Sequence, residues 1–296
     1  MADSALGYLA VDVGGTKLAA GVVDMEGNLV VRDRVPTPQR NVWLALERLI
    51  KRVQAAAGAL QLVACGVGCG GPMDLEQGLV SPLHIPEWRG FPLRERLEAF
   101  TQLPTAVDND AKALALGEGW RGAAAGLDDY LAMVVSTGVG GGLVSGGRLL
   151  DGRLGNAGHI GHVVVVPGGR PCHCGGHGCL EAYASGRAIA AETGRPPEAS
   201  VPAAVVERTG MLVGRAVATV MVTVDLKRAF VGGSVAIGFG EPFFRAAQEE
   251  LDRRLGLSFV HGALIEPVRL GAAGPLVGAA AVARRVRSAH RTTMGA

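Results

Sequence analysis

Short apolar runs divided by turn residues open the chain. The runs YLAVDVG (8–14), LAAGVVD (18–24) and NLVVRDRV (28–35) are rich in β-branched residues. Runs of this length and composition favour strands, and the short turns between them predict antiparallel pairing. Apolar positions then recur every three or four residues from 41 to 57, which indicates a helix. The chain therefore begins with three antiparallel strands followed by a helix.

The same order of elements is predicted twice. The first copy continues with strands at 62–68 and 105–108 and with helices near 92–100 and 109–120. The second copy has strands at 130–136, 141–146, 147–152 and 228–233, and helices near 180–192, 203–223 and 241–255, and a last helix is predicted near 275–288. Two halves that each open with three strands and a glycine turn predict two related α/β domains with a cleft between them. We expect an N-terminal lobe at 1–116, completed by a helix at 276–296, and a C-terminal lobe at 117–275.

Composition narrows the possible function classes. Of 296 residues, 48% are hydrophobic and 19% charged, which is ample apolar material for buried cores. The net charge is only +2 with no basic stripe, and aromatic residues make up 4%, so the pattern is not that of a nucleic-acid binder. No apolar run approaches the roughly 18 residues of a membrane span, and the first residues lack the basic start of a signal peptide. We expect a cytoplasmic protein with no nucleic-acid or membrane partner.

The five cysteines fall into two sets. Cys65 and Cys69 lie in the apolar run LVACGVGCGG and are predicted to be small buried packing residues. The other three are crowded into HIGHVVVVPGGRPCHCGGHGCLE (159–181), behind two histidines. Disulfides are rare in cytoplasmic proteins, and this spacing is too tight for ordinary core positions. A zinc finger, a redox centre and a clamp that shapes a catalytic pocket are all open from the residues alone.

Two glycine turns carry candidate phosphate-binding chemistry. In DVGGTK (12–17) the backbone N–H groups can face an anion, while Thr16 adds a hydroxyl donor and Lys17 a positive charge. Asp12 is suited to hold Mg²⁺ or its water shell near phosphates. An ordinary β-hairpin would also explain so short a motif. STGVGGG (136–142) repeats the arrangement in the second half, and two such turns are what a nucleotide triphosphate would need.

The stretch VDND (107–110) ends a predicted strand where a helix begins. A short polar residue at this point is a favourable helix N-cap. The same stretch suits general-base catalysis, with Asp110 taking a proton from a sugar hydroxyl and Asn109 holding a neighbouring hydroxyl. Capping and catalysis are compatible, so both roles are open. FVGGS (230–234) is, by itself, only a strand-to-helix turn.

Taken together, seven motifs resemble a known family. In chain order they are DVGGTK, CGGPMD (69–74), VDNDAKALALGE (107–118), STGVGGG, AGHIGH (157–162), CHCGGHGCLEAYASG (172–186) and VGGS. The set resembles the ROK family of sugar kinases and repressors over nearly the whole chain, and the cysteine segment is its most specific part. The resemblance implies an α/β protein with the two-lobed actin-like ATPase (ribonuclease H-like) fold, in which duplicated βββαβαβα domains enclose an interdomain cleft.

The resemblance also implies roles for the motif residues. One structural zinc would be held by His162, Cys172, Cys174 and Cys179, which makes the cysteine segment a clamp behind a sugar pocket. The hexose would meet Gly71, Asn109, His159, His162 and Glu181, with Asp110 as the base for its 6-hydroxyl. The ATP phosphates, screened by Mg²⁺, would face Asp12, Gly14, Gly15, Thr16, Lys17, Thr137 and Gly138, and the adenosine would face Gly232 and Gly233. His173 and His177 are interpreted as exposed loop residues.

Two residues depart from the family's pattern. His159 stands where many glucokinases of the family have Glu, and an imidazole cannot accept two hydroxyl hydrogen bonds as a carboxylate does. Lys112 stands where the family often has Asn. The AGHIGH form looks more like bacterial N-acetylmannosamine kinases, so the sugar is left open between two classes.

The function implied is an ATP-dependent hexose kinase acting on the 6-hydroxyl of glucose or a related hexose. The alternative is an N-acetylmannosamine or other amino-hexose kinase. Retention of Asp12, Thr16, Asp110 and Thr137 disfavours a non-catalytic sugar sensor. A DNA-binding repressor is disfavoured because the first phosphate-binding strand starts at residue 8, which leaves no room for an N-terminal helix-turn-helix. The family commonly dimerises, so we expect a homodimer.

Overall fold

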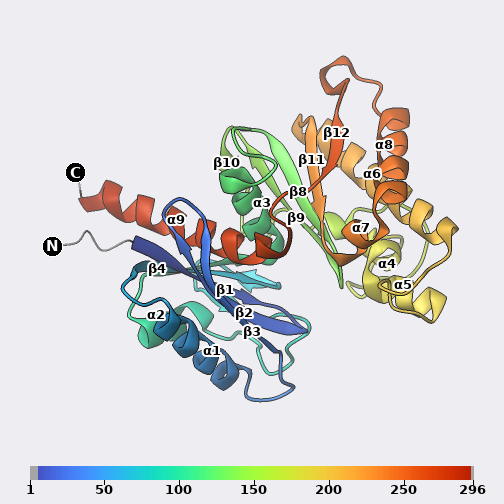
Figure 1. The fold of residues 1–296 in the computed structure, drawn as a ribbon. Coiled ribbons are helices and arrows are strands. Elements are labelled where there is room, and N and C mark those ends of the chain that lie inside the picture. The colour runs from blue at the N-terminus through green and yellow to red at the C-terminus, as the bar shows by residue number, and fades with distance from the viewer. Residues whose placement is uncertain (1–5, 295–296) are drawn as a thin grey trace. The chain divides into compact units, whose positions relative to one another are not determined.

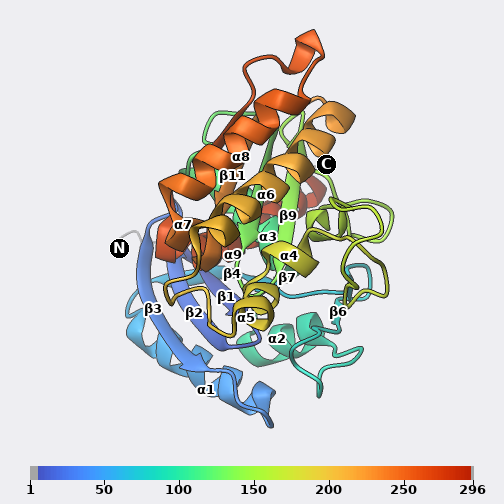
Figure 2. The same ribbon diagram turned by 90° about the vertical axis from the view of Figure 1, so that its right-hand side faces the viewer.

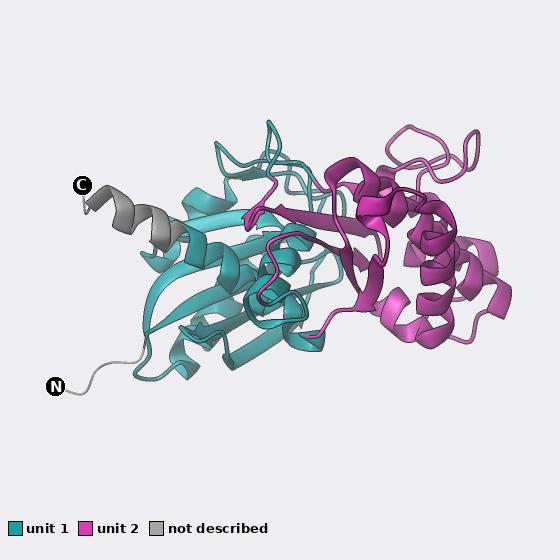
Figure 3. Cartoon of the chain, turned by 90° about the horizontal axis from the view of Figure 1, so that it is seen from above, with its two compact units in different colours: residues 1–125, 151–157, 270–296 teal, residues 126–150, 158–269 magenta. Residues whose placement is uncertain are grey.

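The computed structural model describes residues 6–294, with side chains described as far as Arg285 (Figure 1). The chain packs as two compact units (Figure 3). Unit 1 comprises Met1–Ala125, Asp151–Ala157 and Leu270–Ala296, and unit 2 comprises Gly126–Leu150 and Gly158–Arg269. The units are defined by packing and not by independent folding. The predicted lobes, 1–116 with 276–296 and 117–275, therefore stay a prediction. Residues 295–296 of the predicted last helix lie outside the described residues.

Unit 1 is built on a five-stranded sheet in the order β3-β2-β1-β4-β7. Its strands are β1 (Leu6–Val13), β2 (Lys17–Asp24), β3 (Leu29–Pro36), β4 (Gln61–Cys69) and β7 (Thr105–Asn109). Its helices are α1 (Val42–Ala56), α2 (Leu93–Thr101), α3 (Asp110–Arg121) and α9 (Gly274–Met294), and β5 (Met73–Asp74) and β6 (Leu79–Val80) form a small hairpin. The first three strands pair antiparallel, while β4 joins β1 and β7 in parallel. The antiparallel opening predicted from the sequence is confirmed.

Unit 2 repeats this topology in the order β10-β9-β8-β11-β12. Its strands are β8 (Tyr130–Val135), β9 (Val139–Ser145), β10 (Arg148–Leu149), β11 (Arg228–Gly232) and β12 (Leu264–Pro267). Its α-helices are α4 (Glu181–Ala184), α5 (Gly186–Thr193), α6 (Ala203–Val224), α7 (Ser234–Phe239) and α8 (Glu241–Arg254). Three short 3-10 turns complete the described chain, η1 (Ile160–His162) and η2 (Ser258–Val260) in unit 2 and η3 (Gly271–Ala273) in unit 1.

The second half differs from its prediction at three places. The third strand, predicted at 147–152, is only two residues long. The helix predicted near 180–192 is two helices, because Ser185 is extended (φ −69°, ψ 148°) and its hydroxyl accepts the N–H of Ala188, which caps the second helix. Strand β12 and helix α7 were not predicted, since both are short and lack a clear periodic pattern.

The two faces of the unit 1 sheet are covered by different helices. Alternate residues of β1, including Leu9 and Val11, face the buried side of α1, whereas Tyr8 and Ala10 face α9. The two helices therefore lie on opposite faces of the sheet, as Figures 1 and 2 show. Alternation of side chains along a strand produces this two-sided burial.

Helix α9 approaches the sheet unusually closely. A Cβ at Gly66 of β4 would lie 1.9 Å from the backbone oxygen of Ala279, so only glycine allows this contact. Ala279, Ala280 and Ala283 are buried there with Tyr8. Small residues on both elements let the helix lie directly on the strands. Among the described residues, no helix is both long enough and apolar enough to cross a membrane.

Candidate active site and metal cluster

The first glycine turn joins β1 to β2 in a tight hairpin. The N–H of Gly14 donates to the carbonyl of Lys17 over 3.0 Å. Thr37 braces the turn, since its hydroxyl donates to the carbonyl of Gly14 (2.7 Å) and its N–H to that of Thr16 (3.1 Å). Thr16 and Lys17 are exposed. The turn therefore presents a hydroxyl and a cation at the surface on a braced backbone.

A residue missed from the sequence lies against this turn. A Cβ at Gly15 would come within 2.4 Å of Cβ of His84, so the His84 side chain lies directly against the backbone of Gly15. His84 belongs to the loop that also carries Glu87, whose carboxylate accepts the N–H groups of Asn41 (3.0 Å) and Val42 (2.7 Å) and so caps α1. No local motif signals this contact, because the two segments are far apart in the chain.

Asp12 is the buried carboxylate at the end of β1, with 8% of its surface exposed. Burial, together with the nearby charge of Asp110, raises the pKa of Asp12 to about 7, and the charge of Lys17 partly opposes this rise. Asp12 and Asp110 therefore lie close enough for their charges to interact. The structure brings together two carboxylates that the sequence placed almost 100 residues apart.

The N-terminus of α3 carries the predicted base. Asn109 is the N-cap, and its side-chain oxygen accepts the N–H of Ala111 over 3.0 Å. Asp110 accepts the same N–H over 2.8 Å and is exposed to solvent. The capping role is therefore present. Cys69 pairs with Asn109 across the sheet, so Gly71 leaves the sheet at the same edge.

The second glycine turn joins β8 to β9 in unit 2. The N–H of Ser136 donates to the carbonyl of Gly138 over 2.9 Å, and Thr137 between them is exposed. Its neighbour is the turn after β11, where Gly233 has φ +97° and a Cβ would meet the oxygen of Val135 at 2.3 Å. The hydroxyls of Ser136 and Ser234 are 3.0 Å apart. The two predicted nucleotide segments of unit 2 therefore lie side by side.

Glu181 links the cysteine segment to this turn. Its carboxylate accepts the N–H of Val139 over 2.9 Å, and a Cβ at Gly138 would lie 3.1 Å from the same oxygen. The predicted sugar-binding carboxylate is thus also a structural support of the second glycine turn. The rings of His159 and His162 lie with centroids 5.9 Å apart.

The ligand atoms of His162, Cys172, Cys174 and Cys179 all lie within 4.8 Å of one another. The Cys174 and Cys179 sulfurs are 3.7 Å apart, and the Cys172 sulfur is 3.8 Å from Nδ1 of His162. A tetrahedral zinc with Zn–S bonds of about 2.3 Å requires sulfurs about 3.8 Å apart. A disulfide needs about 2.05 Å, and all described cysteines are free. The cluster fits a structural zinc better than a disulfide.

Two cysteines and two histidines outside the candidate metal cluster lie in the environments that the sequence predicts. Cys65 and Cys69 are fully buried, and burial raises the pKa of the Cys65 thiol to about 12. Such a thiol is unreactive, which confirms a packing role for Cys65. His173 and His177 are exposed loop residues, as expected.

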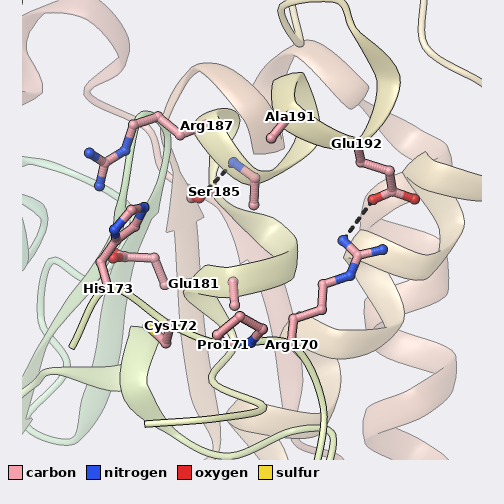
Figure 4. Close-up of a pocket in the computed structure, with 11 residues that line it drawn as sticks. Arg170, Pro171, Cys172, His173, Glu181, Ser185, Arg187, Ala191 and Glu192 are labelled. Carbon is pink, nitrogen blue, oxygen red and sulfur yellow. Dashed lines mark hydrogen bonds and ion pairs between the residues drawn. The ribbon is translucent and has the colours of Figure 1, made fainter. Parts of the chain in front are cut away.

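A cavity of about 390 Å³ lies beside the cysteine loop in unit 2 (Figure 4). In Figure 4 the side chains of Glu181, His173 and Arg187 gather on one side of it. Arg170 and Glu192 form an ion pair of 3.0 Å on the other side. The cavity borders one predicted sugar residue, Glu181, and one predicted zinc ligand, Cys172.

The predicted residues divide cleanly between the units. Unit 1 holds Asp12, Gly14, Gly15, Thr16, Lys17, Gly71, Asn109 and Asp110. Unit 2 holds Thr137, Gly138, His159, His162, Cys172, Cys174, Cys179, Glu181, Gly232 and Gly233. Unit 1 therefore carries the acidic pair and the cation, and unit 2 carries the metal cluster with two glycine turns.

The sequence profile of the ROK family matches residues 8–286 of the chain. The chain belongs to the ROK family. Among solved ROK proteins, the ROK hexokinase of Thermus thermophilus is 35% identical with a TM-score of 0.83, and the match covers 96% of this chain and 99% of that one. This structural likeness confirms the predicted family and the predicted actin-like fold class.

Two relatives of similar identity have different names. A glucokinase of Streptomyces coelicolor is 40% identical over 61% of this chain, and the match spans 57% of the glucokinase's own length. An N-acetylmannosamine kinase of Escherichia fergusonii is 37% identical, with 78% of this chain and 84% of that protein covered. These two relatives are therefore sugar kinases named for different sugars.

Proposed function

We propose that the protein is an ATP-dependent hexose kinase that transfers the γ-phosphoryl group to the 6-hydroxyl of glucose or a related hexose. The observation that carries the proposal is the interaction between Asp12 and Asp110 beside the turn that bears Lys17. A cation and two carboxylates around a glycine turn suit phosphoryl transfer, which depends on positioning and charge neutralisation. Membership of a family whose relatives include sugar kinases supports it.

In the proposed reaction, Asp110 accepts the proton of the 6-hydroxyl as the hydroxyl oxygen bonds to the γ-phosphorus. The bond from that phosphorus to the bridging oxygen of ADP breaks, and ADP carries away the electron pair. Asn109 would orient the sugar, since its side chain lies at the same helix terminus. Lys17 and Thr16 would bind phosphate oxygens.

Asp12 would hold Mg²⁺ or its bound water. The ion would supply positive charge against the β- and γ-phosphates. The raised pKa of Asp12 fits this role, because an approaching cation stabilises the charged form of a buried carboxylate beside another acid.

Zinc, held by His162, Cys172, Cys174 and Cys179, would have a structural part. With four protein ligands the ion leaves no open position for water, so it would not act as a hydrolytic centre. Cys179 is two residues before Glu181, whose carboxylate supports the second glycine turn. Zinc would therefore fix both the sugar-facing loop and, through Glu181, the phosphate-facing one.

The second candidate is an N-acetylmannosamine or other amino-hexose kinase. His159 favours it, since an imidazole cannot replace the paired acceptors that a carboxylate offers to two sugar hydroxyls. The longer match to the N-acetylmannosamine kinase supports the same alternative. A non-catalytic sugar sensor is the third candidate. It is disfavoured because binding a sugar alone would not require the acidic pair of Asp12 and Asp110.

The experiment is to measure ADP release by zinc-replete protein with MgATP and each of glucose, mannose, N-acetylmannosamine, N-acetylglucosamine and free amino-hexoses. We expect sugar-dependent release with at least one hexose and product phosphorylated at the 6-position. Selectivity for an amino-hexose would establish the second candidate, and His159→Glu should then shift preference toward glucose. No sugar-dependent release with any of them would overturn the kinase proposal and leave the sensor.

A further inference from the structure

Helix α3 is hydrogen-bonded to the unit 1 residues next to each point at which the described chain crosses between the two units. The chain passes between them at 125/126, 150/151, 157/158 and 269/270. The unit 1 side of each passage is hydrogen-bonded to a buried side chain of α3, either Lys112 or Glu118. Both side chains are almost fully enclosed, with 1% and 0% of their surface exposed. Burying a charged group costs free energy unless ion-pair and hydrogen-bond partners compensate for the lost water, and both side chains have such partners.

Glu118 serves the far end of the helix. One carboxylate oxygen accepts the N–H of Ala123 over 2.6 Å, just before the first passage. The other accepts the N–H of Leu270 over 3.0 Å, just after the last. These two bonds hold the first and last passages to the C-terminal half of α3.

Lys112 serves the first turn of the helix. Its ammonium donates to the carboxylates of Asp108 (2.9 Å) and Asp151 (2.7 Å) and to the carbonyl of Gly155 (3.1 Å). Three donors therefore meet three acceptors. Arg285 of α9 closes the network, with contacts of 3.3 Å to Asp108 and 3.0 Å to Asp151. The network holds the segment 151–157 between the second and third passages.

This network encloses the proposed catalytic dipeptide. Asp108 immediately precedes Asn109 and accepts its N–H over 2.8 Å, and Lys112 follows Asp110 by two residues. The two residues of the network on either side of the dipeptide are joined by an ion pair with both partners buried. The first turn of α3 is therefore constrained by its side chains as well as by its capping bonds.

We propose that the network of Asp108, Lys112, Asp151 and Arg285 is a positioning device for Asn109 and Asp110. It couples segment 151–157 to the helix turn that carries the proposed base, so that loosening the segment displaces the base. Lys112 and Asp151 are positioning residues in this assignment, because they act on the proposed base through the first turn of α3. The inference rests on the proposed kinase function for its kinetic consequence, but its structural consequence is independent of it.

The test uses Asp151→Asn in the full-length, zinc-replete protein, because Asp151 is partly exposed and its loss leaves the Lys112–Asp108 pair in place. We expect amide hydrogen exchange to quicken at least tenfold over both 151–157 and 108–113. We expect kcat for the preferred hexose to fall 5- to 20-fold while KM for MgATP stays within twofold. Asp151→Glu, which keeps the carboxylate, should recover at least half of the wild-type kcat.

The matched control is Glu118→Gln, which weakens the tether at the other end of the same helix. It should quicken exchange around 122–125 and leave kcat and the exchange of 108–113 within twofold of wild type. Equal loss of kcat in this control, or an unchanged turn in Asp151→Asn, would overturn the proposal. Lys112→Met is the severe variant, and where it does not fold Asp151→Asn decides alone.

The two proposals fail separately. If wild type releases no ADP with any hexose, the kinase proposal fails and hydrogen exchange alone judges the network. Quickened exchange at 108–113 in Asp151→Asn then upholds the positioning of the turn, and unchanged exchange rejects it. If wild type is active but the variant keeps both its kcat and its exchange rates, only the positioning proposal fails.

Discussion

The two glycine turns occupy the same place in two sheets of the same topology, yet they differ in chemistry. The turn after β1 ends a strand at a buried carboxylate, Asp12, and carries Lys17. The turn after β8 carries hydroxyls and a glycine, and the N–H of Val139, which follows the turn, donates to the carboxylate of Glu181. The glycine turn of unit 1 therefore has charged side chains of its own, whereas the side chains of the glycine turn of unit 2 are neutral.

Buried charge follows the same division. Among the described residues, unit 1 buries Asp12, Asp108, Lys112 and Glu118, whereas unit 2 buries only Glu250. Unit 1 orders its site with ion pairs, and unit 2 orders its site with four candidate metal ligands. The comparison teaches that duplicated topology supplies matching sheet edges, while the means of holding functional groups there is particular to each copy.

The largest effect should come from the proposed base Asp110, which begins α3 in unit 1. Asp110→Asn removes the proposed base but keeps a side-chain oxygen to accept the N–H of Ala111, so the fold should be retained. Loss of a general base costs roughly 10²- to 10⁴-fold in kcat. Steady-state ADP release measures it, with circular dichroism as the control for folding. A decrease of less than tenfold would show that Asp110 is not the base.

Removing the metal cluster should affect unit 2 selectively. Cys174→Ala takes away a ligand that is exposed, so the substitution costs little apart from metal binding. We expect zinc content to fall and the free energy of unfolding to drop by about 3 kcal/mol, roughly 5–10 °C in Tm. His177→Ala, in the same loop and outside the cluster, should change neither quantity. Elemental analysis and thermal unfolding decide, and full zinc content in Cys174→Ala would contradict the assignment.

Asp12 should make unit 1 less stable as pH rises. Because its folded pKa is raised to about 7, the stability linked to its protonated form is complete below the unfolded value of 3.8 and is lost as pH rises through 7. Asp12→Asn should therefore raise the free energy of unfolding by about 1–3 kcal/mol at pH 8, with the gain shrinking toward pH 4. Urea unfolding at pH 5, 6, 7 and 8 measures it. A gain independent of pH would show that the Asp12 carboxyl is not the cause.

The smallest effect should come from the neutral turn of unit 2. Thr137→Val removes one exposed hydroxyl that we propose to donate to a phosphate oxygen. One neutral hydrogen bond contributes about 0.5–1.5 kcal/mol, so KM for MgATP should rise roughly two- to tenfold with little change in the KM for the hexose. Thr16→Val in unit 1 is the comparison variant. A larger effect for Thr137→Val than for Asp110→Asn would reverse the expected contrast between the two units.

Much of the fold was predictable because its signals are local. The strands and the two glycine turns follow from apolar periodicity and turn residues. The resemblance to the ROK family supplied the candidate metal ligands His162, Cys172, Cys174 and Cys179. The zinc fit and the approach of Asp12 to Asp110 agree with the predicted roles, which stay predictions until tested in solution.

The features that the sequence did not predict depend on contacts between segments that are distant in the chain. The four-residue spacing of Asp108 and Lys112 is visible in the sequence, but their partners Asp151 and Arg285 are not. His84 against Gly15 and Glu87 at the start of α1 are likewise products of tertiary packing. The break at Ser185 was missed because helical periodicity continues on both sides of it.

Helix α9 has a consequence for how the protein is made. It covers the face of the unit 1 sheet that bears Tyr8 and Ala10, yet it is synthesised after all of unit 2. At about 5–20 residues per second, the interval between β4 and α9 is on the order of 10–40 s. During that time a nascent chain carries an apolar sheet face without its final cover. Unit 2 can complete its packing on the ribosome, whereas unit 1 must wait for its last helix, and that interval is when holding chaperones would be needed.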